Sequence, residues 1–534
     1  MKQTMKRHSF TSQLKSLALV FGIALAFASC ANEDVAQNPT NPNDDNDKNL
    51  TTFVAGEEAK TRTSMDYTSG NFYWEAGDYI YVKDDDGTLQ KSSNAPASKV
   101  AAFKYKVPGK FSASSSYKVY YLGKYNFGGG NSVSILTVQR QTAPDNTEHF
   151  GTAGDYGTAT ANKVTGKNQF KFELEHLPAY LVFQPYTSNT ILQNCYLTKV
   201  EVTSDNDIAE TYTVNPTTGA LDASTVAGGG KEITLYTQDW TSGSSYSNGF
   251  PLTNSTASVT TNGAYMVIKP GTHTLRVRYW VKDVATNVEG TITKTYPSTA
   301  YASNTYYDMK ANLDVKNYDG DHYYMWDAEK QYWKGHEWNL GGSQPTLPTQ
   351  SASSDYPQSS GDTYNRWYHE GGGSGEFNAT QSCAGLPNVN EMIWYAVKGD
   401  PHWDETELWT TMGHLCQGGM WFKKKAYISG YNANTDVDGI DRRYYGGTTS
   451  SSSIVSSGLP DVADAGNYFY LPAMGGYSSG QLNYRSGYNL SGNYWSSSAH
   501  PWHRDEAYRL HFGWSSVTVL NENRNNGFSV GAFE

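Results

Sequence analysis

Apolar and polar residues alternate along most of the chain between Leu50 and Val315, which predicts β-strands. Segments such as SYKVYYL, NQFKFELEHL and HTLRVRYWV place an apolar side chain at nearly every second position, and clusters of Gly, Asn, Asp and Ser separate them. Clear helical periodicity is absent from this region. Because one β-sandwich takes about 100 residues, we expect two sandwich domains in tandem, residues 50–189 and 190–316, with their boundary at YTSNTILQ.

The pattern changes after residue 316. The segment HYYMWDAEKQYWKGHEWN is rich in Trp and Tyr, and a polar stretch of Ser, Pro and Gly follows it. We expect a third domain with an α+β fold over residues 317–534. One helix is predicted to begin at Asn388 with Glu391 in its first turn, and a second to be capped by Asp404 and to end at Gly413. The chain as a whole is expected to be mainly β.

The N-terminus has the features of a bacterial export signal. Basic residues precede the apolar run Leu17–Ala28, which is too short to span a bilayer. The run ends in Phe27-Ala28-Ser29-Cys30, which resembles the bacterial lipobox. This resemblance implies a lipoprotein signal peptide over residues 1–29, a lipidated Cys30 and an anchor in the outer membrane; an ordinary secretory peptide is the alternative. The polar, acidic residues 30–49 are expected to form a disordered tether.

Composition narrows the class of function. The 534 residues include 17% charged and 14% aromatic residues, 41 Tyr and 51 Gly, and the formal net charge is −11. Few charges with many aromatic and Gly residues favour a loop-rich extracellular β protein. The acidic balance argues against nucleic acid as a partner, because binding phosphates needs a basic surface.

The cysteines suggest different roles in different places. Cys195 lies in the alternating segment CYLTKVEV, where a small buried side chain is expected. Cys383 and Cys416 fall in one predicted domain, so in an oxidising compartment they are candidates for a disulfide, with two separate thiols as the alternative.

Three segments resemble the fimbrillin (Mfa-like) family of bacterial pilus subunits. They are TFVAGEEAKTRTSMDYTSGNFYWEAGDYIYV, FELEHLPAYLVFQ and STAYASNTYYDMKANLDV. The resemblance implies removal of the N-terminal strand by an Arg-specific protease and insertion of a strand from another fimbrillin subunit into the groove left behind. Arg62 is the nearest Arg after the tether and is the candidate cleavage site; an outward-facing strand residue is the alternative.

The last domain resembles the FISUMP-type and formylglycine-enzyme-like branches of the C-type lectin-like fold. The resemblance is carried by Leu471-Pro472-Ala473, Tyr494-Trp495-Ser496-Ser497-Ser498, the strand from Ala507 to Phe512, and Asn526-Gly527-Phe528-Ser529-Val530. It implies a domain that displays a binding surface. Formylglycine-generating chemistry is not expected, because it uses cysteines near the C-terminus and no Cys follows Cys416.

One acidic turn is a weak calcium candidate. Asn434, Asp436, Asp438 and Asp441 alternate around a Gly, as at the start of a calcium loop. Tyr445 stands at the twelfth position, where an EF-hand has Glu, so a solvated acidic turn is the alternative. The sugar-binding triplets of calcium-dependent lectins are absent, and no other cofactor is expected.

Several tryptophans are candidates for a ligand-facing surface, with core packing as the alternative: Trp326, Trp333, Trp338, Trp495 and Trp502. The histidines show no short zinc-ligand spacing, and the chain has no GxSxG motif and no phosphate-binding loop. We therefore expect no catalytic residue and no enzyme.

Together, these patterns favour a fimbrial subunit at the outer membrane or cell surface. Because a bulky domain follows the last fimbrillin strand, that strand could not be donated onward, which favours a tip adhesin. Its expected partners are other fimbrillin subunits and a glycan or protein on a host or bacterial surface. A non-polymerising surface glycan-binding lipoprotein is the alternative.

Overall fold

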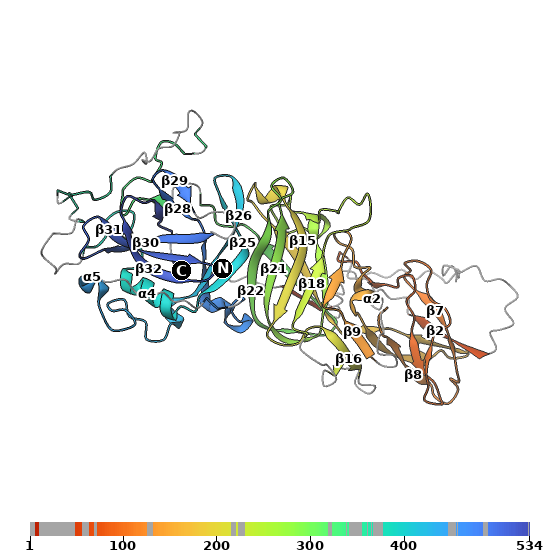
Figure 1. The fold of residues 1–534 in the computed structure, drawn as a ribbon. Helices are drawn as coiled ribbons and strands as arrows, with labels where there is room; N and C mark the ends of the chain where they lie inside the picture. The colour runs from red at the N-terminus through yellow and green to blue at the C-terminus, as the bar shows by residue number, and fades with distance from the viewer. Residues whose placement is uncertain are drawn as a thin grey trace, which may run out of the picture. The chain divides into compact units, whose positions relative to one another are not determined.

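The computed structural model describes the following residues: 6–9, 49–55, 64–68, 72–124, 132–214, 221–222, 230–318, 323–337, 339–340, 355–359, 361–364, 366, 377–446, 455–456, 458–483, 490–531 and 533–534. The chain divides into two compact units (Figure 1). The N-terminal unit comprises Met1–Val281 and Lys294–Asp314, and the C-terminal unit comprises Lys282–Thr293 and Val315–Glu534. Strands dominate both units, so the mainly β prediction is confirmed.

One sheet of the N-terminal unit contains β2 as an interior strand. Its order is β6 (Leu89–Lys91), β5 (Tyr81–Lys83), β8 (Ser116–Tyr121), β11 (Gly157–Lys163), β12 (Gln169–Phe172), β2 (Leu50–Ala55) and β7 (Phe103–Pro108), with β13 (Glu175–His176) paired to β11. Alternate side chains of these strands point into one core that includes Trp74, Tyr105 and Phe170. The alternation in the sequence is therefore the alternation between core and surface.

The other sheets of the N-terminal unit use strands that are far apart in the sequence. One has the order β1 (Lys6–Ser9), β23 (Thr305–Asn312), β14 (Ala179–Tyr186) and β20 (Ala264–Ile268). A second runs β10 (Val138–Arg140), β18 (Glu232–Tyr236), β15 (Tyr196–Ser204), β21 (Gly271–Lys282) and β22 (Glu289–Tyr301), with β19 (Phe250–Pro251) beside β15. Smaller groups are β17 (Leu221–Asp222), β16 (Glu210–Val214) and β9 (Ser132–Ile135), and β3 (Ser64–Met65) with β4 (Phe72–Tyr73). The short helices are α2 (Phe150–Ala153), η2 (Leu192–Asn194) and α3 (Val259–Asn262).

The predicted boundary at residue 190 is not a boundary between sheets. β9 pairs with β16, β10 with β18, and β14 with both β20 and β23, so strands from before residue 190 complete sheets built mainly from later ones. The alternating pattern locates strands but contains no information on which strands pair. The predicted start of the last domain at residue 317 lies close to Val315, although the hairpin tip Lys282–Thr293 also belongs to that unit.

The C-terminal unit combines two groups of strands with one full-length helix. The first group is β25 (His402–Thr411), β26 (His414–Lys423) and β27 (Tyr468–Pro472), which β22 joins through the pair Thr291 and Glu407. The second is β24 (Tyr323–Tyr324), β33 (Phe528–Ser529), β30 (Ser491–Ala499), β31 (Glu506–Gly513) and β32 (Val517–Asn523). The remaining elements are β28 (Gly476–Ser478), β29 (Gln481–Asn483), α4 (Val389–Lys398), α5 (Arg442–Tyr445), η4 (Lys425–Tyr427) and η5 (Val462–Asn467). No helix within the described ranges is long and apolar enough to cross a membrane.

Of the two predicted helices, the first is confirmed and the second is wrong. Asn388 caps α4, and its side chain and that of Glu391 accept each other's backbone N–H in a capping box. The segment predicted as the second helix is strand β25. Met412 and Gly413 have φ angles of +47° and +75° and form a two-residue turn that sends the chain back as β26. Positive φ at both turn positions is the geometry of a tight hairpin, and Gly413 supplies it rather than a helix end.

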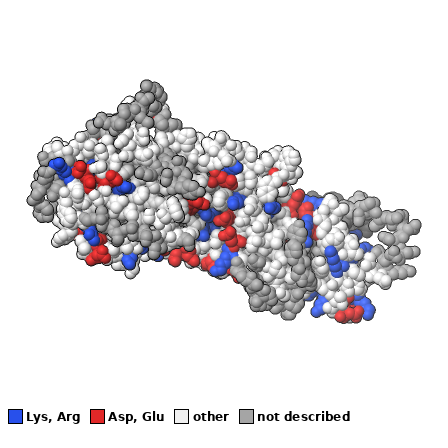
Figure 2. Space-filling view, in the orientation of Figure 1, with Lys and Arg blue, Asp and Glu red and all other residues white. Residues whose placement is uncertain are grey.

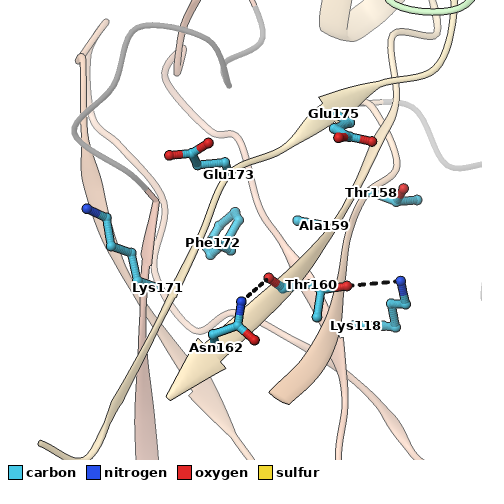
Figure 3. Close-up of a pocket in the computed structure, with 9 residues that line it drawn as sticks. All are labelled: Lys118, Thr158, Ala159, Thr160, Asn162, Lys171, Phe172, Glu173 and Glu175. Atoms are coloured by element: carbon cyan, nitrogen blue, oxygen red, sulfur yellow. Dashed lines mark hydrogen bonds between the residues drawn. The ribbon is translucent and has the colours of Figure 1, made fainter. Parts of the chain in front are cut away.

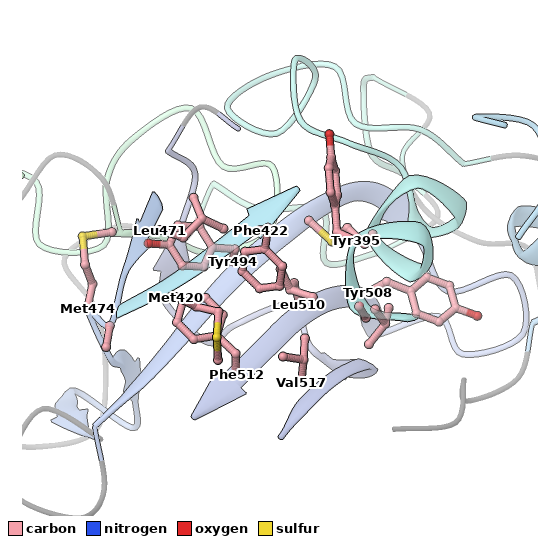
Figure 4. Packing of buried hydrophobic residues seen from close by; sticks show 14 of the residues in the cluster. Tyr395, Met420, Phe422, Leu471, Met474, Tyr494, Tyr508, Leu510, Phe512 and Val517 are labelled. Atoms are coloured by element: carbon pink, nitrogen blue, oxygen red, sulfur yellow. The ribbon is translucent and has the colours of Figure 1, made fainter. Parts of the chain in front are cut away.

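The core of the C-terminal unit collects aromatic and sulfur-containing side chains from the helix and the strands. Side chains of Tyr395, Met420, Leu471, Tyr494 and Phe512 meet in one cluster (Figure 4). The rings of Tyr494 and Phe512 stack with their centroids 5.8 Å apart. Leu471, Tyr494 and Phe512 are among the residues that carry the lectin-like resemblance, so this part of the motifs describes how the unit packs.

Candidate interaction sites

Strand β2 is an interior strand of its sheet. It pairs antiparallel with β7 from Leu50 to Ala55 and parallel with β12 from Thr52 to Ala55. Alternate side chains of β2 are buried, and Phe53 is completely inaccessible to solvent. The Phe53 ring stacks on Phe170 with centroids 5.1 Å apart and meets Phe111 edge-on at the same distance. β2 is held by hydrogen bonds on both edges and by one central aromatic side chain.

Removing β2 would open a groove between β7 and β12. Both neighbours would then present backbone N–H and C=O groups along an unpaired edge, and the floor of the groove would be the aromatic core around Phe170. Such an edge is the surface to which an extended segment of another chain can add as a strand. The geometry of the β2 seat therefore fits strand exchange.

A cavity of about 560 Å³ is lined by residues of β8, β11, β12 and β13 (Figure 3), and Phe172 in its lining pairs with Ala55 at the end of β2. It exists because β11 pairs with β13 at Thr158 and with β12 only from Asn162 onward, which leaves an interruption in the ladder between them. Its lining carries both signs of charge: Lys118, Thr158, Ala159, Thr160, Asn162, Lys171, Phe172, Glu173 and Glu175. Within this lining, the Lys118 ammonium donates to the Thr160 hydroxyl at 3.0 Å.

A second strand edge is occupied by residues that the sequence assigns to the signal peptide. Lys6–Ser9 forms β1, which pairs antiparallel with Thr305–Asp308 of β23. β23 pairs with β14 along its other edge. If the predicted signal peptide is cleaved, β1 leaves with it and this edge of β23 becomes available. The sequence did not predict a strand at this position.

Three of the predicted site residues lie outside the described residues: Cys30, Arg62 and Trp338. Lipidation at Cys30 and cleavage at Arg62 stay predictions. The position of Arg62 in the sequence is nevertheless informative, because β2 lies between Cys30 and Arg62. One cut after Arg62 would separate β2 and the anchor from the rest of the chain.

The candidate disulfide is not formed. Within the described residues, Cys383 and Cys416 are not joined by a disulfide, and Cys195 is buried in the N-terminal unit as expected. Cys383 is completely buried, and its thiol accepts a hydrogen bond from the backbone N–H of Asp327 at 3.3 Å. Burial raises the pKa of the Cys383 thiol. Cys416 lies partly exposed on β26, so the two side chains belong to different local packings.

The calcium candidate gains no support from the geometry. The Asp436 carboxylate accepts from the Arg442 guanidinium at 2.6 Å and from two backbone N–H groups of its own turn. Asp441 caps α5 and accepts from Arg443 at 2.7 and 2.8 Å. Within the described residues, no group of three or more His, Cys, Asp or Glu side chains is placed to hold a metal ion. Arginines therefore occupy the oxygens that calcium would need.

The candidate ligand-facing tryptophans separate into two classes. Trp326 and Trp495 are completely buried and donate their indole N–H groups to backbone carbonyls, so the prediction that they face a ligand is wrong. Trp333 is partly buried and packs against the core. Trp502 is 52% exposed on the loop between β30 and β31. Aromatic spacing alone does not distinguish these environments, because both kinds of residue occur in similar Trp- and Tyr-rich segments.

A buried polar centre in the C-terminal unit was not predicted from the sequence. Asp327 is fully buried with a φ of +55°, and its carboxylate accepts from the backbone N–H groups of Thr380, Gln381 and Cys383 at 2.7, 2.8 and 3.1 Å. Arg366 joins it to Asp362 through an ion pair on each side. A lone Asp inside the aromatic segment YYMWDAEK was the one available signal, because an acidic residue among buried aromatics needs partners.

A second buried guanidinium lies beside this centre. Arg524 donates to the backbone carbonyls of Arg366 and Glu506 and stacks over the Trp326 ring at 4.6 Å. Burial, followed by the neighbouring positive charge of Arg366, lowers the pKa of Arg524 to about 9. These contacts connect the residues around Arg366, Glu506 and Trp326 to one another.

Surface charge does not single out a binding face. On the side shown in Figure 2, the described acidic and basic residues are interspersed, and most of the surface is neither.

The chain was also compared with known proteins. No protein-family model matches it, and no curated protein matches it. It is similar to a solved structure of a candidate cell adhesion protein from Bacteroides ovatus, with 14% identity, a TM-score of 0.29, and coverage of 50% of this chain and 93% of that chain. It is similar to the fimbrial anchor protein Mfa2 from Porphyromonas gingivalis, with 13% identity, a TM-score of 0.22, and coverage of 47% and 83%. For a fimbrial protein from Bacteroides ovatus, the identity is 11%, the TM-score is 0.22, and the coverage is 90% and 98%.

Proposed function

We propose that this chain is a fimbrial subunit at the cell surface, that the seat of β2 accepts a strand from another subunit, and that the C-terminal unit is displayed as a binding domain. The observation that carries the proposal is the position of β2. It is an interior strand held on both edges, and it lies between the predicted anchor at Cys30 and the candidate cleavage site at Arg62. A fimbrial or adhesive role at the cell surface is the coarse form of the proposal.

The energetics favour replacement of β2 rather than a vacant groove. Loss of β2 exposes the aromatic partners of Phe53 and leaves the hydrogen-bonding edges of β7 and β12 without a partner strand. A new strand with an apolar residue at the Phe53 position restores both the aromatic burial and the backbone hydrogen bonds. The ladder hydrogen bonds depend on the backbone and not on the sequence. Exchange therefore requires an alternating pattern in the incoming strand and little else.

The order of the units supports a terminal position in a fimbria. β23 ends at Asn312, and the C-terminal unit resumes at Val315. A strand followed at once by a folded unit cannot be threaded into a neighbour's groove, so this chain accepts a strand but does not donate β23. This is the expected behaviour of a tip subunit. Lipidation at Cys30 would hold the precursor at the outer membrane before cleavage.

A strand-replacement experiment tests the proposal. The chain without its signal peptide is cut with an Arg-specific protease and separated from its N-terminal fragment, and the remainder is mixed with a synthetic peptide of residues 48–57, which contains β2. Native mass spectrometry is expected to show one bound peptide per chain. The same peptide with Phe53→Asp is the matched control and is expected not to bind. A folded chain that lacks β2 and binds neither this peptide nor a purified fimbrial subunit would contradict the proposal.

The exposed Trp502 favours a second candidate function, a surface glycan-binding lipoprotein that does not polymerise. In that case the chain keeps β2 in place, and the Arg62→Ala variant behaves like the wild type in every assay of surface display. We propose binding rather than catalysis in both cases.

A further inference from the structure

Exposed apolar side chains concentrate at one place in the C-terminal unit. Of the eleven large apolar side chains that are exposed in the described part of the chain, four belong to this place: Ile440, Tyr444, Tyr445 and Trp502. Tyr445 is the most exposed of all eleven at 66%. Soluble proteins seldom gather exposed aromatic residues without a binding role. This group, with Gly446, is called the Trp502 platform below.

Gly446 packs against the indole of Trp502. A Cβ placed on Gly446 would lie 3.0 Å from indole atoms Cδ2 and Cε3 and 3.3 Å from the Pro501 ring. Gly446 has a φ of +59°, which also favours glycine. Because Gly446 directly follows α5 (Arg442–Tyr445), this contact brings the C-terminal end of α5 next to the Trp502 loop. The ring has one face packed and remains about half exposed.

Both sides of the platform are held in place by buried polar groups. The imidazole Nδ1 of His500, which is buried, accepts the backbone N–H groups of Trp502 and His503 at 3.1 and 3.0 Å. On the other side, the Asn390 side chain binds both the Asp441 carboxylate and the backbone N–H of Arg442 at 3.0 and 2.9 Å. The aromatic residues therefore sit on a preorganised base, which lowers the entropy lost on binding.

The charges around the platform favour an uncharged ligand. Residues 434–446 and 500–506 contain five carboxylates and three arginines, a net charge of −2 with the histidines neutral. Arg442 and Arg443 are already paired with Asp436 and Asp441 at 2.6 and 2.7 Å. An anionic ligand would meet net negative charge here. The paired side chains still offer donors and acceptors to hydroxyl groups.

Other exposed tryptophans lack this setting. The ring of Trp240, in the N-terminal unit, has the Arg140 guanidinium over it at 4.1 Å and the Tyr236 ring beside it at 5.6 Å. Trp514 is 62% exposed on the turn between β31 and β32. It is the natural control, since it has similar exposure in the same unit without the Gly446 support.

We propose that the Trp502 platform binds a neutral saccharide, whose apolar C–H face stacks on the indole and the α5 tyrosines while its hydroxyl groups bind the surrounding polar side chains. An exposed, rigid aromatic surface with compensated charges matches this chemistry, because a sugar ring is apolar on its faces and polar at its rim. The inference rests on the proposed display of the C-terminal unit and names its ligand class.

The test uses the full mature chain on an array of immobilised oligosaccharides. Neutral gluco-, galacto-, manno- and xylo-oligosaccharides form one arm, sialylated and sulfated oligosaccharides the second, and host surface proteins the third. We expect binding to neutral members, and in solution titration with the strongest neutral ligand, the Trp502→Ala variant is expected to lose about tenfold or more in affinity. Trp514→Ala is expected to stay within about twofold of the wild type.

A second variant keeps the test valid if Trp502→Ala disturbs the loop. Gly446→Ala leaves every aromatic residue in place but pushes a methyl group against the indole, so it is expected to weaken saccharide binding while circular dichroism stays unchanged. Three results would overturn the proposal: binding confined to the charged or protein arm, no binding to any neutral member, or equal effects of the Trp502 and Trp514 variants. Strand replacement at the β2 seat is measured separately, so either proposal can fail while the other stands.

Discussion

Strand β2 in the N-terminal unit and the Asp327 centre in the C-terminal unit both tie a segment of chain to a core, but by opposite means. β2 uses ladder hydrogen bonds on two edges and one large apolar side chain, Phe53. At Asp327, three backbone N–H groups and the Arg366 guanidinium converge on one buried carboxylate. The ladder hydrogen bonds repeat along β2, whereas the contacts of the C-terminal unit meet at the single carboxylate of Asp327.

The difference bears on which part of the chain can exchange a segment. A ladder with alternating apolar side chains accepts any strand of the same pattern, so the seat of β2 is general. The Asp327 centre favours a carboxylate at that position, because any other side chain removes one of the two acidic partners of Arg366 and the acceptor of three backbone N–H groups. The proposed strand exchange therefore concerns the N-terminal unit, and the proposed Trp502 platform concerns the C-terminal unit.

The largest expected effect follows from removing the carboxylate. Asp327→Ala leaves the buried Arg366 with Asp362 as its remaining acidic partner and leaves three backbone N–H groups, one of them from the buried Cys383, without this acceptor. We expect the C-terminal unit to lose about 4 kcal/mol in free energy of unfolding. Denaturant titration with hydrogen exchange resolved by unit measures it, because the N-terminal unit should keep its protection.

Asp438→Ala is the matched control for this prediction. Asp438 is also acidic but its side chain is 70% exposed and lies 3.9 Å from Arg442. We expect it to change the free energy of unfolding by less than about 0.5 kcal/mol. If both variants lowered the free energy of unfolding equally, the buried contacts of Asp327 would not stabilise the C-terminal unit more than an exposed carboxylate does.

The next effect concerns β2. Phe53→Ala removes the ring that stacks on Phe170 and is expected to cost the N-terminal unit about 3 kcal/mol, from lost burial and the cavity left behind. Val54→Ala on the more exposed face of the same strand should cost about 1 kcal/mol or less. Hydrogen exchange of β7 and β12 reports the loss directly. If Val54→Ala weakens protection as much as Phe53→Ala, the side-chain part of the comparison is wrong.

The contrast also explains what the sequence could predict. The alternation around Phe53 and the cap at Asn388 are local signals, and both appear in the structure as expected. Pairing is not local: β14 completes a sheet with β20 and β23 from far along the chain, so the strand pairs that cross residue 190 could not be predicted from the pattern. The hairpin at Met412 and Gly413 was misread because a Gly after an apolar run also ends helices.

The candidate site was predictable only in part. Trp326 and Trp495 are as aromatic and as close to polar residues in the sequence as Trp502, yet the first two are buried and the third is exposed. What distinguishes Trp502 is a contact with Gly446, more than fifty positions away. Asp327 has the same character, since the groups that donate hydrogen bonds to its carboxylate lie far along the chain.

A smaller effect is expected at the start of α4, where the C-terminal unit does use a local device. The Asn388 side chain accepts the Glu391 N–H at 3.0 Å and also donates to the Ala433 carbonyl at 2.9 Å. Asn388→Ala should cost about 1 kcal/mol in free energy of unfolding. Asn434→Ala, at an exposed position, should have almost no effect. If Asn388→Ala lowered the free energy of unfolding as much as Asp327→Ala, a helix cap and the buried Asp327 carboxylate would contribute equally to stability, and the comparison would fail.

The smallest effect is a dependence of stability on pH through His500, beneath the Trp502 platform. Burial, then the nearby positive charges of His503 and Arg524, lowers the pKa of His500 to about 4. Because an unfolded histidine has a pKa of about 6.5, only the unfolded state binds a proton between these values. The stabilisation is complete above about pH 6.5 and is lost as pH falls toward 4.

Protonation would also remove the acceptor for the Trp502 and His503 N–H groups, since His500 Nδ1 could no longer accept them. Between pH 7.5 and 6 we expect the C-terminal unit to lose about 0.5 kcal/mol, after allowance for solvent screening. Denaturant titrations at the two pH values measure the change, and His500→Gln should reduce the dependence without abolishing folding. A wild-type C-terminal unit that is more stable at pH 6 would mean that His500 is protonated in the fold, and the base of the platform would then be held by charge, as the Asp327 centre is.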